Sequence, residues 1–299
     1  MINMKRFIKT HILCGIVAMV SLLMGCNSAP TKPVLTVSIQ PQKYLLERIV
    51  GDKFDVQCLL AKGANPESYE PNMTHLINLE KSHIYFSIGN LGFELAIKNK
   101  LQVNAPQLKV VNCSQGIKLL QGTHSGVLHT ETNCSHGHNH EVDPHVWTSV
   151  VNAKIIAENM YKTVLEYDPK HKDFYTNNFN ALTLELDALQ NELAQTLAPK
   201  AGTAFAVWHP SLSYFARDYN LTQIAMECEG KEVSAGMLKK EIDVAKESNV
   251  KVLFFQKEFD NRQIKVINEE LGARLVEINP MAYEWAEEMR SIAYAISTE

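Results

Sequence analysis

The chain has 299 residues, of which 45% are hydrophobic and 21% are charged. This length is enough for two domains or one large one, and the composition is that of an ordinary globular protein. The net charge of −4 argues against a surface that binds nucleic acid.

The first 25 residues have the pattern of an export signal. Three basic and no acidic side chains occur among the first nine residues, and residues 12–24 form an apolar core. This core is too short for a helix that spans a membrane. We therefore predict that residues 1–25 are a signal peptide and are not part of the fold.

The signal ends in L-M-G-C, which looks like a bacterial lipobox. Cleavage before Cys26 would leave a lipid on the thiol of the new N-terminal residue, and residues 26–33 would form a short lipidated tether. The alternative is an ordinary signal peptide in which this cysteine is incidental. We expect an exported lipoprotein that is anchored to the membrane, in the periplasm or at the cell surface.

Between residues 34 and 168, short β-branched runs alternate with amphipathic stretches. The expected strands are V-L-T-V-S-I (34–39), F-D-V-Q-C-L-L (54–60), H-I-Y-F-S-I-G (83–89) and L-K-V-V-N (108–112). The expected helical segments are 42–50, 74–81, a single turn at 94–98, and 149–167. Strands separated by helices of this length favour right-handed βαβ units and a parallel sheet. We predict an N-terminal α/β lobe over residues 34–168, with a loop at 124–140.

A long helix is expected next. Asp168-Pro169 is a helix-start signal, and the chain then has no glycine and no further proline before Pro199. Apolar side chains recur at helical spacing at Phe174, Phe179, Leu182, Leu186, Leu189, Leu193 and Leu197. The pattern predicts a helix of roughly 28 residues, about 42 Å long. We expect residues 169–199 to form a strut that connects two lobes and belongs to neither core.

The last hundred residues, 200–299, repeat the α/β pattern. The expected strands are 205–208, 221–226, 250–256 and 274–278, and the expected helices are 212–219, 234–248, 261–271 and 281–297. The predicted fold is therefore α/β, with two parallel-sheet (βα)4 lobes joined by one long backbone helix. A cleft between two such lobes is a common place for a ligand.

The stretch from residue 124 to residue 147 holds six of the eleven histidines of the chain. Neutral imidazole is the commonest protein ligand for a borderline transition metal. A tract of histidines with interspersed Gly, Ser and Asn has little to bury, which predicts a loop. The alternatives are a solvated polar insert or an engineered tag, although a tag would be uninterrupted and terminal. We expect accessory metal capture by His124, His129, His136, His138 and His140.

Four further side chains follow an expected strand or the loop, where parallel-sheet proteins place ligand groups. They are Glu67, His145, His209 and Glu284. Two imidazoles and two carboxylates satisfy a divalent transition metal, and the carboxylates neutralise its charge. Taken singly, Glu67 could instead cap a helix, His209 could be a hydrogen-bonded histidine at a strand end, and Glu284 could lie on a helix surface. The reserve carboxylates near the same strand ends are Glu70, Glu227 and Glu229.

Four cysteines follow the signal and the anchor, namely Cys58, Cys113, Cys134 and Cys228. An exported compartment permits disulfides, and four cysteines allow three pairings between which the sequence does not choose. No C-x-x-C occurs, so a zinc site built from thiolates is not expected.

Several motifs, in order along the chain, resemble those of one family. They are G-A-N-P-E-S-Y-E-P, a histidine-rich loop before D-P-H-V-W, W-H-P-S-L-S-Y-F-A, E-G-K-E-V-S-A, F-F-Q-K-E-F and I-N-P-M-A-Y-E-W. The chain resembles the zinc/manganese substrate-binding lipoproteins of bacterial ABC importers, the cluster A-I type of solute-binding protein. The resemblance covers essentially all of the chain after the signal. It implies two three-layer α/β lobes and a linking backbone helix.

The resemblance also implies ligands and a metal. By position, His145 and His209 match the second and third histidine ligands of the family, and Glu284 matches its acidic ligand. The first ligand, usually the histidine of G-A-D-P-H-x-Y-E-P, is Glu67 here. This oxygen makes the site harder and resembles manganese-binding members, whereas the histidine-rich loop and the intrinsic order of affinities favour zinc. We expect Zn2+, with Mn2+ or Fe2+ as the alternative.

The function implied by the resemblance is high-affinity capture of the metal and its delivery to the permease and ATPase of an ABC importer. We expect a monomer with no enzymatic activity. A metallohydrolase is the rival enzyme class, but the chain has no H-E-x-x-H and no G-x-S-x-G, and four protein ligands would close the site to water. Two non-enzymatic rivals use the same scaffold, namely a binding protein for a siderophore, corrinoid or haem, and a surface adhesin.

Overall fold

The computed structural model describes residues 32–66, 68–121, 142–227, 234–257 and 261–298. Residues 1–32 and 33–299 form separate units, and every helix and strand named below belongs to the second unit. The predicted signal peptide, Cys26 and the histidine-rich loop lie outside the described residues. In the part of the chain that is described, no helix has both the length and the apolar character needed to cross a membrane.

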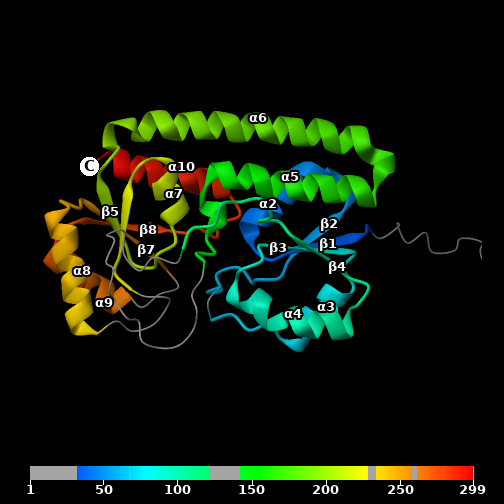
Figure 1. Cartoon of the computed structure of the whole chain (residues 1–299), viewed down its shortest axis with the longest axis horizontal. Coiled ribbons are helices and arrows are strands. Elements are labelled where there is room, and N and C mark those ends of the chain that lie inside the picture. Colours follow the sequence, from blue (N-terminus) through cyan, green and yellow to red (C-terminus); the bar gives the residue numbers. More distant parts are fainter. Residues whose placement is uncertain (1–31, 67, 122–141, 228–233, 258–260, 299) are drawn as a thin grey trace, which may run out of the picture. The chain divides into compact units, whose positions relative to one another are not determined.

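The N-terminal lobe is built on a four-stranded parallel sheet. Its strands are β1 (Val34–Val37), β2 (Asp55–Cys58), β3 (Ile84–Ser87) and β4 (Lys109–Asn112), in the order β2-β1-β3-β4. The central strands β1 and β3 are mostly β-branched, leucine or aromatic, and nearly all of their side chains are buried, as expected of a parallel sheet covered on both faces. Helices α2 (Gln40–Val50) and α5 (Val150–Tyr167) lie on one side, and α3 (Met73–Glu80) and α4 (Gly92–Asn104) lie on the other (Figure 1).

The C-terminal lobe repeats this plan. Its strands are β5 (Ala204–Val207), β6 (Thr222–Ala225), β7 (Val252–Gln256) and β8 (Arg274–Ile278), in the order β6-β5-β7-β8. Helices α7 (Ser213–Asp218) and α10 (Trp285–Ser297) lie on one side of the sheet, and α8 (Ala235–Glu247) and α9 (Asn261–Leu271) lie on the other (Figure 1). The predicted fold class, two three-layer α/β lobes with parallel sheets, is confirmed.

The long helix α6 (Lys172–Leu197) has 26 residues and follows a short 3-10 turn at Pro169–His171. It runs along α5 and α10 (Figure 1) and packs on α2, α5 and α10, so it contacts helices of both lobes. Its buried apolar face consists of Tyr175, Leu182, Leu186, Leu189, Leu193 and Leu197. These side chains belong to the same hydrophobic cluster as the core of the N-terminal lobe. The expectation that the helix belongs to neither core was wrong, because helices of both lobes bury its apolar stripe.

Gly51 shows how closely α6 approaches the N-terminal lobe. This residue ends α2 with a φ of +55°, and a Cβ at this position would lie 2.8 Å from Cζ of Phe174 in α6. Both the left-handed backbone and the short distance favour glycine. One turn further along α6, the Asn178 amide donates a hydrogen bond to the carbonyl oxygen of Ile49 at 3.0 Å. The end of α2 is therefore held directly against the long helix.

Two helices differ in extent from the predictions. The expected turn at 94–98 is a helix of 13 residues, α4, whose first turn is stabilised because the Glu94 carboxylate accepts hydrogen bonds from the backbone N–H groups of Ile88, Gly89 and Leu91. The last helix begins at Trp285 rather than at residue 281. Residues 279–284 instead form turns, in which the Asn279 side chain accepts a hydrogen bond from the Met281 N–H.

Candidate metal centre

The structure brings His145 and His209 together. His145 directly precedes a 3-10 turn that leads into α5, and His209 follows β5 by two residues. Their Nε2 atoms are 3.1 Å apart, and the two residues are 5% and 3% exposed. Two of the four predicted ligands therefore meet, one from each lobe, in a site that excludes bulk water.

Each imidazole is held from behind by a buried carboxylate. Asp143 Oδ1 accepts hydrogen bonds from the backbone N–H of His145, at 2.8 Å, and from its Nδ1, at 2.9 Å. Glu227 Oε1 lies 2.5 Å from Nδ1 of His209. An ionised carboxylate only accepts hydrogen bonds, so in the neutral form of each ring the proton is on Nδ1 and Nε2 carries a lone pair. Carboxylate–imidazole–metal arrangements have this form, because the carboxylate fixes the tautomer and makes the ring a better donor of electrons.

The two Nε2 atoms cannot form a hydrogen bond with each other when both rings are neutral, because neither nitrogen then carries a proton. Two lone pairs at 3.1 Å repel each other unless a cation lies near both. Two nitrogen ligands of a tetrahedral zinc ion, each at about 2.0–2.1 Å, are about 3.3 Å apart. The separation of the Nε2 atoms in this structure therefore fits two ligands of one zinc ion.

Asp143 remains ionised in its buried position. Burial by itself would raise the pKa of this carboxyl. The hydrogen bond from the His145 side chain, the attraction of that ring and the hydrogen bond from the His145 N–H outweigh the effect of burial, and the pKa is lowered. The Asp143 carboxylate is therefore available as an acceptor for the Nδ1 proton at any pH at which the site could hold a metal.

A small cavity adjoins the two histidines. It is lined by Asn65, Pro66, His145, Trp147, His209, Ser211, Gln256, Pro280 and Met281. Its volume of about 10 Å³ is roughly what one water molecule needs. The cavity thus has room for one water molecule or a single ion, and a siderophore, a corrinoid or a haem does not fit in it.

Trp147 connects the lobes next to the cavity. Its indole N–H donates a hydrogen bond to the carbonyl oxygen of Pro280 at 3.0 Å, and the centre of its ring is 5.2 Å from that of His145. The tryptophan is 1% exposed. Trp147 precedes α5 and Pro280 follows β8. The hydrogen bond therefore joins two segments of the cavity wall that are far apart in the sequence.

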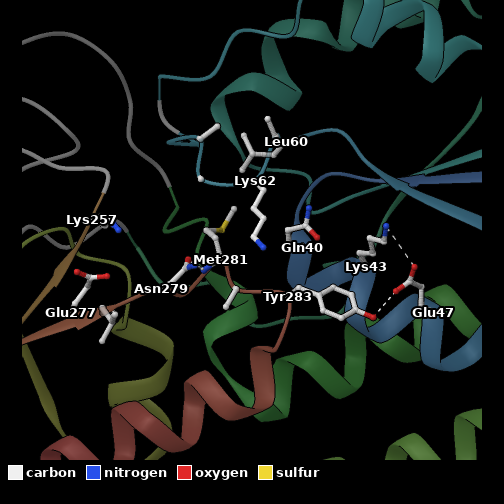
Figure 2. A pocket seen from close by; sticks show the side chains of 15 residues that line it. Gln40, Lys43, Glu47, Leu60, Lys62, Lys257, Glu277, Asn279, Met281 and Tyr283 are labelled. Atoms are coloured by element: carbon white, nitrogen blue, oxygen red, sulfur yellow. Dashed lines mark hydrogen bonds and ion pairs between the residues drawn. The ribbon is translucent and has the colours of Figure 1, made fainter.

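A larger groove of about 710 Å³ adjoins the cavity, and Met281 lines both. Figure 2 shows Lys62 entering this groove from one lobe, and Glu277 and Asn279 entering from the other. At one end, the Tyr283 hydroxyl donates a hydrogen bond to Glu47 Oε2 at 2.6 Å (Figure 2). The groove carries charged side chains from both lobes and is much larger than the cavity beside it.

Some predicted residues cannot be placed. Glu67 and the accessory histidines of the loop lie outside the described residues, although Asn65 and Pro66, which directly precede Glu67 in the chain, line the cavity. Within the described ranges, no group of three or more His, Cys, Asp or Glu side chains could hold a metal ion. Within these ranges the structure therefore brings together His145 and His209 as a pair.

Glu284 is not brought to the histidines. It directly precedes the first residue of α10, and its side chain is exposed. Its charge adds to the effect of burial in raising the pKa of Tyr44 and of Tyr283. Within I-N-P-M-A-Y-E-W, the residues that line the cavity are Pro280 and Met281. Glu284, the carboxylate of this motif, was the predicted ligand. The turns at 279–284 instead place Pro280 and Met281 at the cavity.

Several residues of the site were not predicted from the sequence. Asp143 belongs to the D-P-H-V-W motif but had no predicted role, and Glu227 was expected only as a reserve ligand. Ser211 and Gln256 were not singled out, although both line the cavity. The spacing of D-P-H could have suggested Asp143, whereas the pairing of Glu227 with His209 spans 18 residues and has no local signal. The other reserve ligand that can be placed, Glu70, is exposed.

The two cysteines that can be placed are not part of the site. Cys58 and Cys113 are both free thiols, and Cys134 and Cys228 lie outside the described residues. Burial raises the pKa of Cys58 to about 12 and raises that of Cys113 further. These two thiols therefore remain protonated at neutral pH and are poor metal ligands.

The fold and the cavity define a two-lobed solute-binding protein whose binding site has the size of a single ion. The family described as zinc-uptake complex component A, periplasmic (ZnuA) matches residues 35–298, and the chain belongs to this family of substrate-binding transport proteins. The predicted family is thus confirmed.

Individual relatives agree with the family. The chain is 27% identical to the high-affinity zinc uptake system protein ZnuA of Bacillus subtilis over 275 residues, which cover 87% of this chain and 85% of the relative. A crystal structure of ZnuA has a TM-score of 0.80 and 36% identity, and the match covers 89% of this chain and 98% of the other. A ZnuA deletion mutant with zinc bound has a TM-score of 0.79 and 37% identity, with coverage of 89% and 97%.

Proposed function

We propose that this chain captures Zn2+ and delivers it to the permease and ATPase of an ABC importer. The observation that carries the proposal is the pair of buried imidazoles whose Nε2 atoms face each other at 3.1 Å, each with its Nδ1 proton directed to a carboxylate. When both rings are neutral, the two Nε2 atoms carry lone pairs, and this arrangement fits a borderline cation that prefers nitrogen ligands.

The proposed ligands are His145, His209 and Glu67. Glu67 supplies the negative charge that two neutral imidazoles lack, and it directly follows two residues of the cavity wall. Glu284 is left out of the set because its side chain is exposed and lies beside Tyr283. The proposal includes no enzymatic activity, since a cavity of about 10 Å³ has no room for a second reactant beside the ion.

The remaining parts of the proposal concern the segments before and beside the lobes. Residues 1–25 are a signal peptide, and lipid on Cys26 anchors a monomeric protein to the membrane, in the periplasm or at the cell surface. The histidines of residues 124–140 bind further zinc ions more weakly, because a loop must be ordered to hold them. Their role is to raise the local concentration of zinc near the groove.

The proposal is tested by competitive titration of the purified protein with Zn2+ and Mn2+. We expect one tight zinc site that prefers zinc to manganese, and His209→Ala should weaken it by at least about 100-fold because one of two nitrogen ligands is lost. His171→Ala is the matched control, since His171 contacts Asp168 at the start of α6, away from the cavity. A tight site that survives His209→Ala would refute the assignment, and a preference for manganese would favour the alternative metal.

Deletion of residues 125–140 separates the loop from the cavity. The deletion removes four of the five accessory histidines and keeps His145. The number of zinc ions bound should fall while the affinity of the tightest site stays within about threefold, because that site is held by buried carboxylates. Loss of the tightest site would show that the loop supplies a primary ligand.

A further inference from the structure

Gln256 is the last residue of β7, and its side-chain amide is buried. Within the described part of the chain, only the nitrogen of this amide has a hydrogen-bond partner. The residue is 2% exposed, and its Nε2 donates a hydrogen bond to Ser211 Oγ at 2.8 Å. Its Oε1 has no hydrogen-bond partner among the residues that the structure describes. A buried carbonyl oxygen without a partner costs free energy, and native proteins leave few such groups unless a ligand or water satisfies them.

The amide belongs to the wall of the metal cavity. Gln256 and Ser211 both line that cavity together with His145 and His209. The position follows from the sheet, because β5 pairs with β7 in the register Val207↔Phe254, so that His209 and Gln256 both lie two residues further along, at the same end of the two strands. An acceptor is thus built into the site at which the imidazoles present their lone pairs.

A second buried glutamine in the same lobe shows that this is not a general property of the sheet. Gln223 lies in β6 and is 7% exposed. Its Oε1 accepts a hydrogen bond from the Leu212 N–H at 2.7 Å, and its Nε2 donates one to Ser213 Oγ at 2.9 Å. Both ends of that amide are satisfied within the protein, whereas the oxygen of Gln256, a residue of the cavity wall, has no partner among the described residues.

We propose that Gln256 is a specificity-determining residue of the metal site, and that its Oε1 accepts a hydrogen bond from a water molecule on the bound ion. The inference rests on the proposed function and adds to it a fourth group in the coordination sphere. The ion lies between the two Nε2 atoms, and the adjoining cavity of about 10 Å³ takes the water. The cavity has no space for a reactant beside this water molecule. A catalytic zinc site, in contrast, keeps a position open for the substrate.

The neutrality of the amide gives the site its preference. An amide oxygen satisfies the water without adding a negative charge, and the imidazoles remain the dominant ligands. Imidazole nitrogen suits zinc, whereas each additional charged oxygen ligand suits manganese better. Gln256 therefore keeps the site selective for the softer of the two ions.

The test compares Gln256→Leu and Gln256→Glu with Gln223→Leu as the control. Three quantities are measured: the Kd for Zn2+ and for Mn2+ by competition, the visible absorption spectrum of the Co2+-loaded protein, and the unfolding temperature without metal. Gln256→Leu should bind zinc about 10–100-fold more weakly and change the cobalt spectrum, as expected when the partner of a ligand is lost. Gln223→Leu should lower the unfolding temperature and leave both metal readouts unchanged.

Gln256→Glu keeps the acceptor and adds a charge. It should retain tight zinc binding and strengthen manganese binding more, so that the ratio of the two Kd values moves toward manganese. The proposal is overturned if folded Gln256→Leu keeps the wild-type Kd and cobalt spectrum. If Gln256→Leu fails to fold, the proposal is overturned when Gln256→Glu has the same ratio of the zinc and manganese Kd values as the wild type. Failure of the proposed function is a separate result, because it would show as absent zinc binding in the wild type or as tight binding in His209→Ala.

Discussion

The two lobes have the same strand order, and each contributes one buried imidazole, but they support it by different routes. In the N-terminal lobe, Asp143 holds both the backbone and the ring of His145, two residues further along the same segment. In the C-terminal lobe, the support of His209 comes from Glu227, 18 residues away and beyond the neighbouring strand β6. The same pairing of a carboxylate with Nδ1 of a buried imidazole is thus produced by a local turn in the N-terminal lobe and by strand pairing in the C-terminal lobe.

Each histidine therefore depends on a different part of its own lobe. His145 keeps its support as long as the D-P-H turn is intact. His209 keeps its support only if β5 and β6 stay paired in the register Val207↔Ala225, which places the residues after both strands side by side. Both histidines further depend on a common frame, because α6 packs on helices of both lobes.

The largest effect should come from removing either imidazole. Binding to the folded state alone stabilises a protein by about 4 kcal/mol when the free metal is a thousand times its Kd. His145→Ala and His209→Ala should each abolish most of the increase in unfolding temperature caused by zinc, and to the same degree, because the two ligands are equivalent. Calorimetry with and without zinc measures this. A variant that keeps the full shift would show that its lobe does not contribute to the site.

The common frame is tested by truncating the buried face of α6. Leu189 is 2% exposed, so Leu189→Ala should lower the free energy of unfolding by about 3 kcal/mol through lost burial and the resulting cavity. Leu184 lies in the same helix and is 71% exposed, and Leu184→Ala should change the stability by less than about 0.5 kcal/mol. Denaturant unfolding without metal gives both values. Equal effects of the two substitutions would support a helix that is only a strut.

Replacing either of the carboxylates that support the imidazoles should have a smaller effect on zinc affinity than removing an imidazole. Glu227→Gln and Asp143→Asn should weaken zinc binding by about 10–100-fold, as is usual for groups that orient a metal-bound imidazole. We expect the larger loss for Glu227→Gln, because Asp143→Asn retains a local turn that still holds the His145 N–H. Competitive titration of both variants decides the order. The reverse order would contradict the distinction between local and sheet-dependent support.

The smallest effect is expected for Glu284→Ala. The side chain is exposed and lies away from the residues that line the cavity, so the zinc affinity should remain within about twofold of the wild type. The same titration measures it, with His209→Ala as the positive control. A loss of 100-fold would restore Glu284 as a primary ligand and would require residues 279–284 to rearrange on binding.

Much of the fold could be predicted from the sequence because alternating strands and helices have distinct periods. That His145 and His209 lie together could be predicted because each follows a strand or a loop within a specific motif. The role of Glu227 could not, since it depends on the register of β5 and β6. Gln256 carries no local signal either, because only the packed structure shows that its oxygen lacks a partner among the described residues. Glu284 was predicted from its place after a strand and from the family's acidic ligand, and the turns at 279–284 that expose it are not visible as a period.

The central claim is that one zinc ion lies between an imidazole of each lobe. An anomalous difference map from crystals of the zinc-loaded protein, recorded on both sides of the zinc absorption edge, tests this claim most directly. We predict a strong peak within bonding distance of Nε2 of both His145 and His209, about 2.0–2.1 Å from each. A map with zinc peaks elsewhere and none between these two nitrogens would contradict the account.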